Sequence, residues 1–370
     1  MDFTPTEAQQ DLEQLTRDIA TKLVTPERQR ELDAAAERLD EPLWHALSDA
    51  GVLAAALPDA VGGGGFGVLE QCTILRELGR TLGAVPYLPS VVLAAGALAE
   101  FGTPAQQEFA QRAASGEILT VALAEENNDE PARPVTAVAQ HDSGWALTGA
   151  KIAVPVANRA VRMLVPAATP DGVAVFLVDP KAAGVTVVAQ QVVDNSVECL
   201  VGFDEVQLSA DDLLGSLETG ADVVSWLLTR AALGLAASQL GTLERALELV
   251  SDYARERVQF ERPIGSFQAV AQRLADAYID VKGVRLTVLQ AAWQLSEGLP
   301  AAAEVRAAKF WAADAGHRVA HTLVHVHGGV GLDTDHIAHR YFLAAKHNEF
   351  ALGSATDQLR HLGAILAVSA

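Results

Sequence analysis

Hydrophobic residues recur along this 370-residue chain with two different periods. In the first third they follow helical spacing, starting after Thr4 and Pro5, where Glu7 completes a capping pattern at a predicted helix start. We therefore expect the N-terminal third to be all-helical. The first helix should run to about Val24, with further helices near residues 26–39, 41–51, 68–82, 88–101 and 104–114. The four glycines at 62–65 lack a following Lys-Ser or Lys-Thr, so they predict an interhelical turn rather than a phosphate cradle.

The spacing changes to alternation between Glu117 and about Gly215. Runs rich in valine, threonine and alanine, such as WALTGAKIAV and GVAVFLVD, are separated by Asp-Gly and Asp-Ser-Gly turns, which predicts a small antiparallel β domain or barrel. Helical spacing then returns in long segments with short connections, typical of a bundle. These segments lie near residues 217–260, 267–297, 300–327 and 335–366.

The chain is thus expected to be an α+β protein in three parts. These are an N-terminal helical domain over 1–116, a middle β-barrel domain over 117–215 and a C-terminal four-helix bundle over 216–370. With half of its residues hydrophobic, the chain can bury a large core.

Composition narrows the classes of function. A net charge of -20 argues against nucleic acids or anionic membranes as partners, because both would be repelled. Cys72 and Cys199 lack CxxC spacing, so neither a disulfide framework nor a zinc site is indicated. No secretory signal or membrane span is visible, and we expect a cytoplasmic protein. The histidines 321, 325, 327, 336 and 339 lack an accompanying acidic ligand set, so we expect no metal site.

Chemistry-bearing residues gather in two motifs of the C-terminal part. RVQFERPIGSFQ supplies Arg257, a planar fork suited to phosphate, and Gln268, an amide. HVHGGVG supplies Gly328 and Gly329, a backbone without side chains that would hold a ligand at a distance. A dinucleotide pyrophosphate needs this combination of groups. Read singly, either motif is also compatible with an ordinary helix cap or turn.

Together these motifs resemble the C-terminal domain of the acyl-CoA dehydrogenase family, flavoenzymes that desaturate acyl-CoA thioesters. The resemblance implies the family's three-part fold and an FAD whose adenosine and pyrophosphate end is bound here while its isoalloxazine lies in the neighbouring subunit. This chain has Glu261 where the family usually has glycine, which adds a negative charge near the diphosphate. By position, the implied cofactor-binding residues are Arg257, Phe260, Gln268, His325, Val326, His327, Gly328 and Gly329.

The same resemblance implies that this chain has no catalytic base of its own. The family's two base positions fall on Leu352 and Ala231, and the glutamate of some relatives slightly later in that helix is Ser238 here. Neither an apolar side chain nor a lone serine can take the proton next to a thioester carbonyl. The family's flavin-ring motifs are replaced by AEENNDEP at 124–131 and KIAVP at 151–155. We interpret Glu125 as part of a solvated acidic loop, with no catalytic residue in the chain.

Retained adenosine-end residues and a lost flavin site suggest pairing with a different chain. Segments such as VPYLPSVVLAAGALAEFG and YIDVKGVRLT are most similar to the non-catalytic β subunit of heterotetrameric (α2β2) steroid-side-chain acyl-CoA dehydrogenases of actinobacteria. This resemblance implies a homologous catalytic partner subunit, which supplies the glutamate, and a steroid-CoA substrate from cholesterol side-chain β-oxidation. Two alternatives stay open: a self-sufficient homomeric dehydrogenase with a displaced base such as Glu349, and a flavin-free structural or regulatory homologue.

Overall fold

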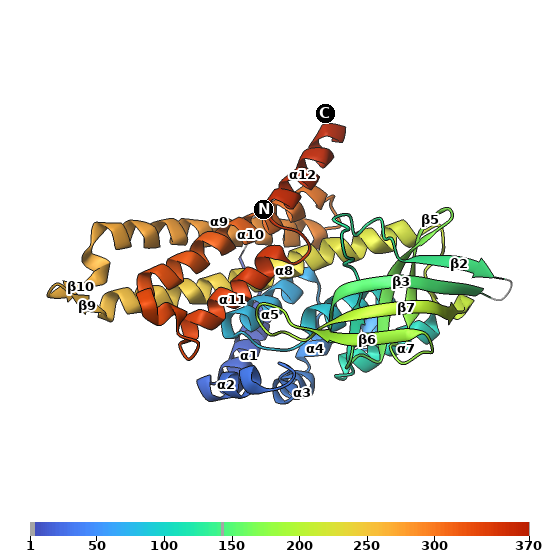
Figure 1. Ribbon diagram of the computed structural model, residues 1–370, viewed down its shortest axis with the longest axis horizontal. Coiled ribbons are helices and arrows are strands. Elements are labelled where there is room, and N and C mark those ends of the chain that lie inside the picture. The colour runs from blue at the N-terminus through green and yellow to red at the C-terminus, as the bar shows by residue number, and fades with distance from the viewer. Residues whose placement is uncertain (1–3, 142–143, 370) are drawn as a thin grey trace. The chain divides into compact units, whose positions relative to one another are not determined.

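The computed structural model describes residues 4–141 and 144–369 (Figure 1). Helices make up the first part of the chain, strands the middle and helices the remainder, which confirms the predicted α+β class. The chain folds into two compact units. One contains Met1–Ala36, Val68–Ala84 and Ala232–Ala370, and the other contains Glu37–Gly67 and Val85–Ala231. The boundaries 1–116, 117–215 and 216–370 stay a prediction.

The first helix, α1 (Glu7–Leu23), begins two residues later than predicted. Its N-cap is Thr6 rather than Thr4, because the Thr6 hydroxyl accepts from the Gln9 N–H while the Gln9 side chain accepts from the Thr6 N–H. This reciprocal pair satisfies two backbone donors at the helix start. The helices that follow are α2 (Pro26–Ala34), α3 (Glu41–Asp49), α4 (Val52–Ala55), α5 (Val68–Thr81), the π-helix η2 (Tyr87–Ala95), α6 (Gly96–Phe101) and α7 (Pro104–Ala114).

The glycine-rich loop before α5 is a turn, as predicted. A short 3-10 helix, η1 (Asp59–Val61), precedes it. A Cβ atom at Gly63 would lie 2.0 Å from the Leu57 carbonyl oxygen, so close backbone packing requires glycine there.

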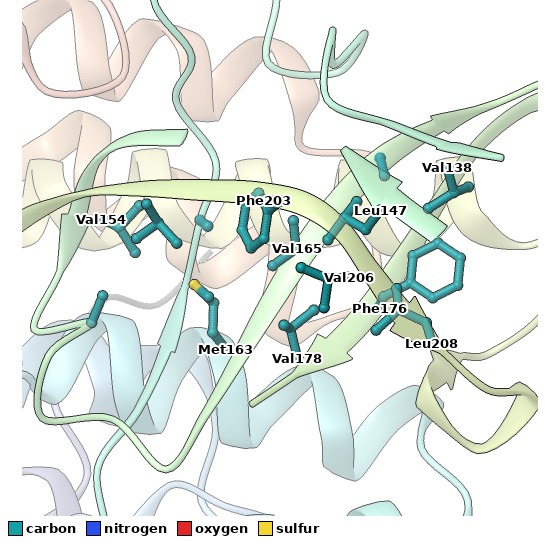
Figure 2. Packing of buried hydrophobic residues seen from close by; sticks show 14 of the residues in the cluster. Val138, Leu147, Val154, Met163, Val165, Phe176, Val178, Phe203, Val206 and Leu208 are labelled. Atoms are coloured by element: carbon teal, nitrogen blue, oxygen red, sulfur yellow. The ribbon is translucent and has the colours of Figure 1, made fainter. Parts of the chain in front are cut away.

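The strands form one eight-stranded sheet in the order β6-β7-β3-β2-β4-β5-β8, with β1 beside β4. The sheet differs from the antiparallel prediction in two places, because β1 and β2 each pair with β4 in parallel. Its buried face forms a hydrophobic cluster in which Val165, Phe176 and Phe203 take part (Figure 2). The strands are β1 (Leu119–Val121), β2 (Ala137–His141), β3 (Gly144–Pro155), β4 (Arg162–Thr169), β5 (Gly172–Val178), β6 (Val185–Gln190), β7 (Glu198–Leu208) and β8 (Leu213–Leu214), with the 3-10 helix η3 (Ala210–Asp212) before the last.

The C-terminal helices follow the predicted segments except the last. A small hairpin, β9 (Val258–Gln259) and β10 (Arg262–Pro263), joins the ends of α8 and α9 and lies at the left of Figure 1. The fourth predicted segment is two helices rather than one. The elements are α8 (Gly220–Glu256), η4 (Ile264–Ser266), α9 (Gln268–Ser296), α10 (Ala302–His327), η5 (Gly328–Leu332), α11 (Ile337–Phe350) and α12 (Ala355–Ser369).

The break between α11 and α12 has a tertiary cause. Leu352 and Gly353 adopt positive φ of 55° and 96°. The buried Lys309 ammonium donates to the carbonyls of Asn348, Glu349 and Gly353, the first at 2.8 Å, and the Gln358 amide donates to the Leu352 carbonyl at 2.9 Å. These side chains satisfy backbone acceptors that an uninterrupted helix would have satisfied itself.

One helix among the described residues, α8, is long and apolar enough to cross a membrane. Of its most apolar window, 61% is buried inside the protein. Its buried positions include Leu227, Leu233, Leu240 and Leu243. This pattern is that of the core helix of a soluble fold.

Candidate cofactor-binding site

The first predicted motif forms the end of α8 and the hairpin after it. The Arg257 N–H donates to the Tyr253 carbonyl at 2.8 Å, and the Arg257 carbonyl accepts from the Ile264 N–H at 2.8 Å. Phe260 and Glu261 occupy the two turn positions with φ of 52° and 65°. A two-residue hairpin with both φ values positive is a type I′ turn, which glycine and asparagine favour. The sequence comparison identified Glu261 as a change of charge; the structure adds that it occupies a position suited to glycine.

The Arg257 side chain is exposed at the base of this hairpin. Its neighbour Arg255 pairs with Asp252, whereas no described residue of the chain forms an ion pair or side-chain hydrogen bond with the Arg257 guanidinium. Within the described part of the chain, the positive charge of Arg257 therefore has no counter-charge. Such a group can bind an anion through two parallel N–H donors.

Phe260 and Gln268 lie on either side of the short segment that leads into α9. Phe260 is 86% exposed and touches Phe267 edge-on, with ring centroids 6.0 Å apart. Gln268 is the first residue of α9, and its side chain is exposed. An aromatic ring this exposed adds nothing to the chain's own core, and it is available to a ligand or a partner surface.

The second predicted motif ends α10. His325 is exposed, Val326 is partly buried and His327 is buried. The His327 Nδ1 lies 2.7 Å from the Leu323 carbonyl, and its ring stacks on Tyr253 with centroids 4.2 Å apart. Burial lowers the pKa of His327, which favours the neutral ring with Nδ1 as donor.

Tyr253 therefore joins the two motifs. It stands four residues before Arg257, one helical turn away, and contacts His327 with its ring. Tyr253 was not identified as a candidate from the sequence, although a residue four positions before Arg257 on a helix lies on the same face. His327 serves as an internal packing contact in this chain, and its position near the cofactor end is set by that stacking.

The two glycines of the second motif, Gly328 and Gly329, are explained by different observations. Gly328 has φ 66° and ψ -144°, a combination that only glycine adopts readily. Gly329 has no positive φ, and a Cβ atom there would meet nothing within 4 Å. Packing within the chain leaves the absence of a side chain at Gly329 unexplained. Open space at a glycine backbone, with a free guanidinium on the adjoining element, fits a diphosphate that approaches the backbone closely.

The positions that would carry a catalytic base hold none. Leu352 lies in the break between α11 and α12, and Ala231 is buried in α8. Glu349, the displaced alternative, is buried, and its carboxylate lies 2.6 Å from Lys346 Nζ and 3.2 Å from His317 Nδ1. Among the residues that the structure describes, no three histidine, cysteine or acidic side chains gather as a metal site would require.

The structure corrects the interpretation of Glu125. Far from lying in a solvated acidic loop, its side chain is 4% exposed and pairs with the fully buried Lys151 at 2.8 Å. It also accepts from Asn128, and from the N–H groups of Val135 and Thr136 at 2.5 and 2.8 Å. Burial alone would raise the pKa of Glu125, but these donors, Lys151 first, hold it at about 2.

No local signal identifies this ion pair. Lys151 lies on β3, and the two residues meet only because the sheet brings that strand to the loop at 124–131. Within the segment at 124–131, Glu125 is therefore part of an internal network, and its carboxylate already has donors within the chain.

Known proteins resemble this chain in both sequence and structure. The model of the acyl-CoA dehydrogenase N-terminal domain matches residues 6–117, and that of the C-terminal domain matches residues 218–367. The chain is 52% identical to the acyl-CoA dehydrogenase FadE27 of Mycobacterium tuberculosis over 99% of both chains. Its structure is similar to a chain of the ChsE4-ChsE5 complex from the same species, with TM-score 0.95, 53% identity and 99% of both chains covered. A chain of the Tcur3481-Tcur3483 steroid ACAD matches with TM-score 0.93, 37% identity and 98% of both chains covered.

Proposed function

The chain belongs to the acyl-CoA dehydrogenase family, oxidoreductases acting on CH–CH bonds, and we propose that it is the β subunit of a heteromeric steroid acyl-CoA dehydrogenase. The observation that supports this role most is the contrast between its two cofactor regions. Among the residues that the structure describes, none pairs with the Arg257 side chain, and a Cβ atom at Gly329 would meet nothing within 4 Å, whereas Glu125 and Lys151 form a buried ion pair. One end of a cofactor site is thus available and the other is filled by the chain itself.

The available end would hold the adenosine and diphosphate of FAD. Arg257 would bind the diphosphate as a fork, Gly328 and Gly329 would let it approach the backbone, and Phe260, Gln268 and His325 would line it. Bound FAD supplies the acceptor for the hydride that leaves the carbon β to the thioester. This chain's contribution is to retain and orient the cofactor.

The reacting end would belong to a homologous partner subunit. A proton next to the thioester carbonyl needs a carboxylate base, and Leu352 and Ala231 cannot supply one. We propose an α2β2 assembly in the cytoplasm, with the partner supplying the glutamate and binding the CoA thioester of a steroid side chain in cholesterol catabolism. The C-terminal part of the chain carries exposed apolar residues that a partner would cover, namely Val258, Phe260, Tyr278, Ile279, Leu286, Val330, Leu332 and Phe350.

A homomeric dehydrogenase that uses Glu349 is the second candidate. Its carboxylate is buried beside Lys346 and His317, so it has the position of a held, charged group rather than a free base. Release from Lys346 would have to precede proton transfer in that scheme.

Flavin content per chain tests the proposal. The isolated chain should bind little FAD and show no dehydrogenase activity. Co-expression with a homologous chain that carries a glutamate at the position of Leu352 should give a complex with one FAD per pair of chains. A stoichiometric flavin spectrum from the isolated chain, bleached by an acyl-CoA, would contradict the β-subunit role.

Leu352→Glu in the isolated chain provides the matching control. The variant restores a carboxylate at the family position but leaves the Glu125–Lys151 network in place. We expect no activity from it, because the flavin ring would still lack its donors. Activity from this single change would show that only the base had been lost.

A further inference from the structure

A polar cavity lies within the unit that contains α1, α2 and α5, and none of its lining residues belongs to the two cofactor motifs. Its volume is about 580 Å³, within the range of roughly 300–1,000 Å³ typical of small-molecule sites. The end of α1, the start of α2, the end of α5, α8 and the start of α11 contribute to it. Five arginines line this arginine cavity: Arg17, Arg30, Arg80, Arg245 and Arg340.

This concentration of positive charge runs against the composition of the protein. The chain has a net charge of -20 and 27 lysines and arginines in all. Against the five arginines, the cavity wall contains two carboxylates, Glu77 and Asp335. The other carboxylates that pair with these arginines, Glu13, Glu27, Asp33, Glu244 and Glu248, are not part of the wall, so the groups that face the cavity are mainly guanidinium groups.

Carboxylates hold the guanidinium groups in position. Glu77 is fully buried and accepts from Arg17 Nε at 2.9 Å and from Arg76 Nη2 at 2.9 Å, so two cations compensate its charge. Arg80 lies between Glu244 and Glu248, at 3.2 and 2.8 Å.

Each of the other three arginines forms an ion pair with a carboxylate. Arg30 pairs with Glu27 at 2.9 Å, Arg245 with Glu248 at 3.0 Å and Arg340 with Asp33 at 2.5 Å. A guanidinium has five N–H donors, and one such contact leaves most of them for a further acceptor.

Backbone carbonyls that would repel an anion at the end of α5 already accept hydrogen bonds. The carbonyls at the end of α5 carry the negative end of the helix dipole. The buried Gln29 amide donates to the Thr81 and Leu82 carbonyls at 3.4 and 3.2 Å, and the Tyr341 hydroxyl donates to the Arg80 carbonyl. Of the two carboxylates of the wall, Glu77 is fully buried and Asp335 is exposed.

We propose that the arginine cavity binds a phosphate-bearing small molecule. Several forked, pre-positioned guanidinium groups match the oxygen geometry of phosphate, and a site of this size has room for more than a single phosphate. The assignment does not depend on FAD binding, because none of its lining residues belongs to the two cofactor motifs.

Calorimetric titration of the full chain with inorganic phosphate, pyrophosphate and AMP tests the proposal. Binding of any of the three supports it, and the order of affinities tells whether a free phosphate, a diphosphate or a nucleotide fits best. Because pyrophosphate and AMP can also bind near Arg257, the titration is repeated with Arg257→Ala, which should retain the site. Absence of heat with all three probes at millimolar concentration would overturn the assignment and leave the cavity as an ion-pair network.

Helix α2 offers a matched pair of variants. Arg30 lines the cavity and pairs with Glu27, whereas Arg28 pairs with Glu31 at 3.0 Å and is not part of the wall. Arg30→Gln should raise the dissociation constant about fivefold to tenfold, and Arg28→Gln less than about twofold. Equal effects of the two changes would overturn the site, because only a general charge effect would remain.

A third variant works in the opposite direction. Asp335→Asn removes the exposed carboxylate of the wall and should lower the dissociation constant of the tightest probe by about twofold to fivefold. Weaker binding in this variant would contradict an anion site, since loss of a negative charge can only favour a bound phosphate. Unchanged unfolding midpoints of the Arg30→Gln and Asp335→Asn variants would show that the folded state is preserved.

Discussion

The hairpin at Arg257 and the loop at Glu125 each carry a charged side chain, but the first is exposed and the second is buried with hydrogen-bond donors around it. Arg257 is exposed and has no side-chain partner within residues 4–141 and 144–369, and a Cβ atom at Gly328 or Gly329 would meet nothing within 4 Å. Glu125 is buried with four hydrogen-bond donors around it, including Lys151. A buried charge must be satisfied by its own fold, whereas a charge intended for a ligand is left unsatisfied until the ligand arrives. Glu125 and Lys151 are therefore expected to stabilise this chain, whereas we propose that Arg257 serves a ligand.

The largest effect should come from breaking the buried ion pair. Lys151→Met would leave the Glu125 carboxylate buried without its cation, and we expect the free energy of unfolding to fall by about 3–5 kcal/mol. Urea unfolding followed by circular dichroism measures the change. The double variant Glu125→Gln/Lys151→Met should recover most of the loss. A cost below about 1 kcal/mol for Lys151→Met would show that the network does not stabilise the sheet.

Acid should weaken the same region. The pKa of Glu125 is lowered in the folded protein to about 2, below its ordinary value of 4.5. Its contribution is therefore present above pH 4.5 and is lost as the pH falls toward 2. We expect this one group to account for about 2–3 kcal/mol of the lost stability. Urea midpoints between pH 2 and 7 should decline less steeply in Glu125→Gln than in the wild type, and equal slopes would refute this.

Removing the exposed charge of Arg257 should leave the fold unchanged and weaken FAD binding. In the complex, Arg257→Ala should cost about 1.5–3 kcal/mol of FAD binding, or roughly one to two orders of magnitude in affinity. FAD titration of the apo complex measures it, and turnover at saturating FAD should approach that of the wild type. Arg255→Ala, which removes a neighbouring arginine paired with Asp252, is the control.

Two outcomes would contradict the proposed β-subunit role. FAD affinity that does not respond to Arg257→Ala would remove the cross-subunit cofactor site. Loss of turnover with Glu349→Ala would favour the homomeric enzyme with a displaced base, since in the heteromeric scheme Glu349 affects neither affinity nor turnover.

The smallest effect concerns the hairpin turn itself. Glu261 has φ 65°, a conformation that L side chains disfavour, so Glu261→Gly should raise the free energy of unfolding by about 0.5–1 kcal/mol. Glu261→Gln keeps the side chain and removes the charge. If Glu261→Gln strengthens FAD binding without stabilising the chain, charge and backbone strain act separately. Stabilisation by glutamine equal to that by glycine would mean that the strain is negligible.

Local signals in the sequence determined the order of elements and the cofactor motifs. Helical and alternating spacing are properties of neighbouring residues, so α5, α7, α9 and the strands lie close to where the sequence predicts them. Arg257 and Gly329 could be named as candidates because they lie in short contiguous motifs, and their role in FAD binding stays a prediction. The start of α1 was displaced by two residues because Thr4 and Thr6 both offer a capping side chain, and only the Gln9 amide distinguishes them.

Tertiary contacts decided the remainder. Whether Glu125 is solvated or buried depends on Lys151 on another strand, and the break at Leu352 depends on Lys309 from a different helix. His327 lies inward because Tyr253 of α8 offers a ring to stack on, and the arginine cavity exists only because four stretches of the chain meet, at 17–30, 77–82, 245 and 335–341. Each of these features arises from residues far apart in the chain. Their pairing is set by the packing of whole elements, and no local pattern of hydrophobic and polar positions contains that information.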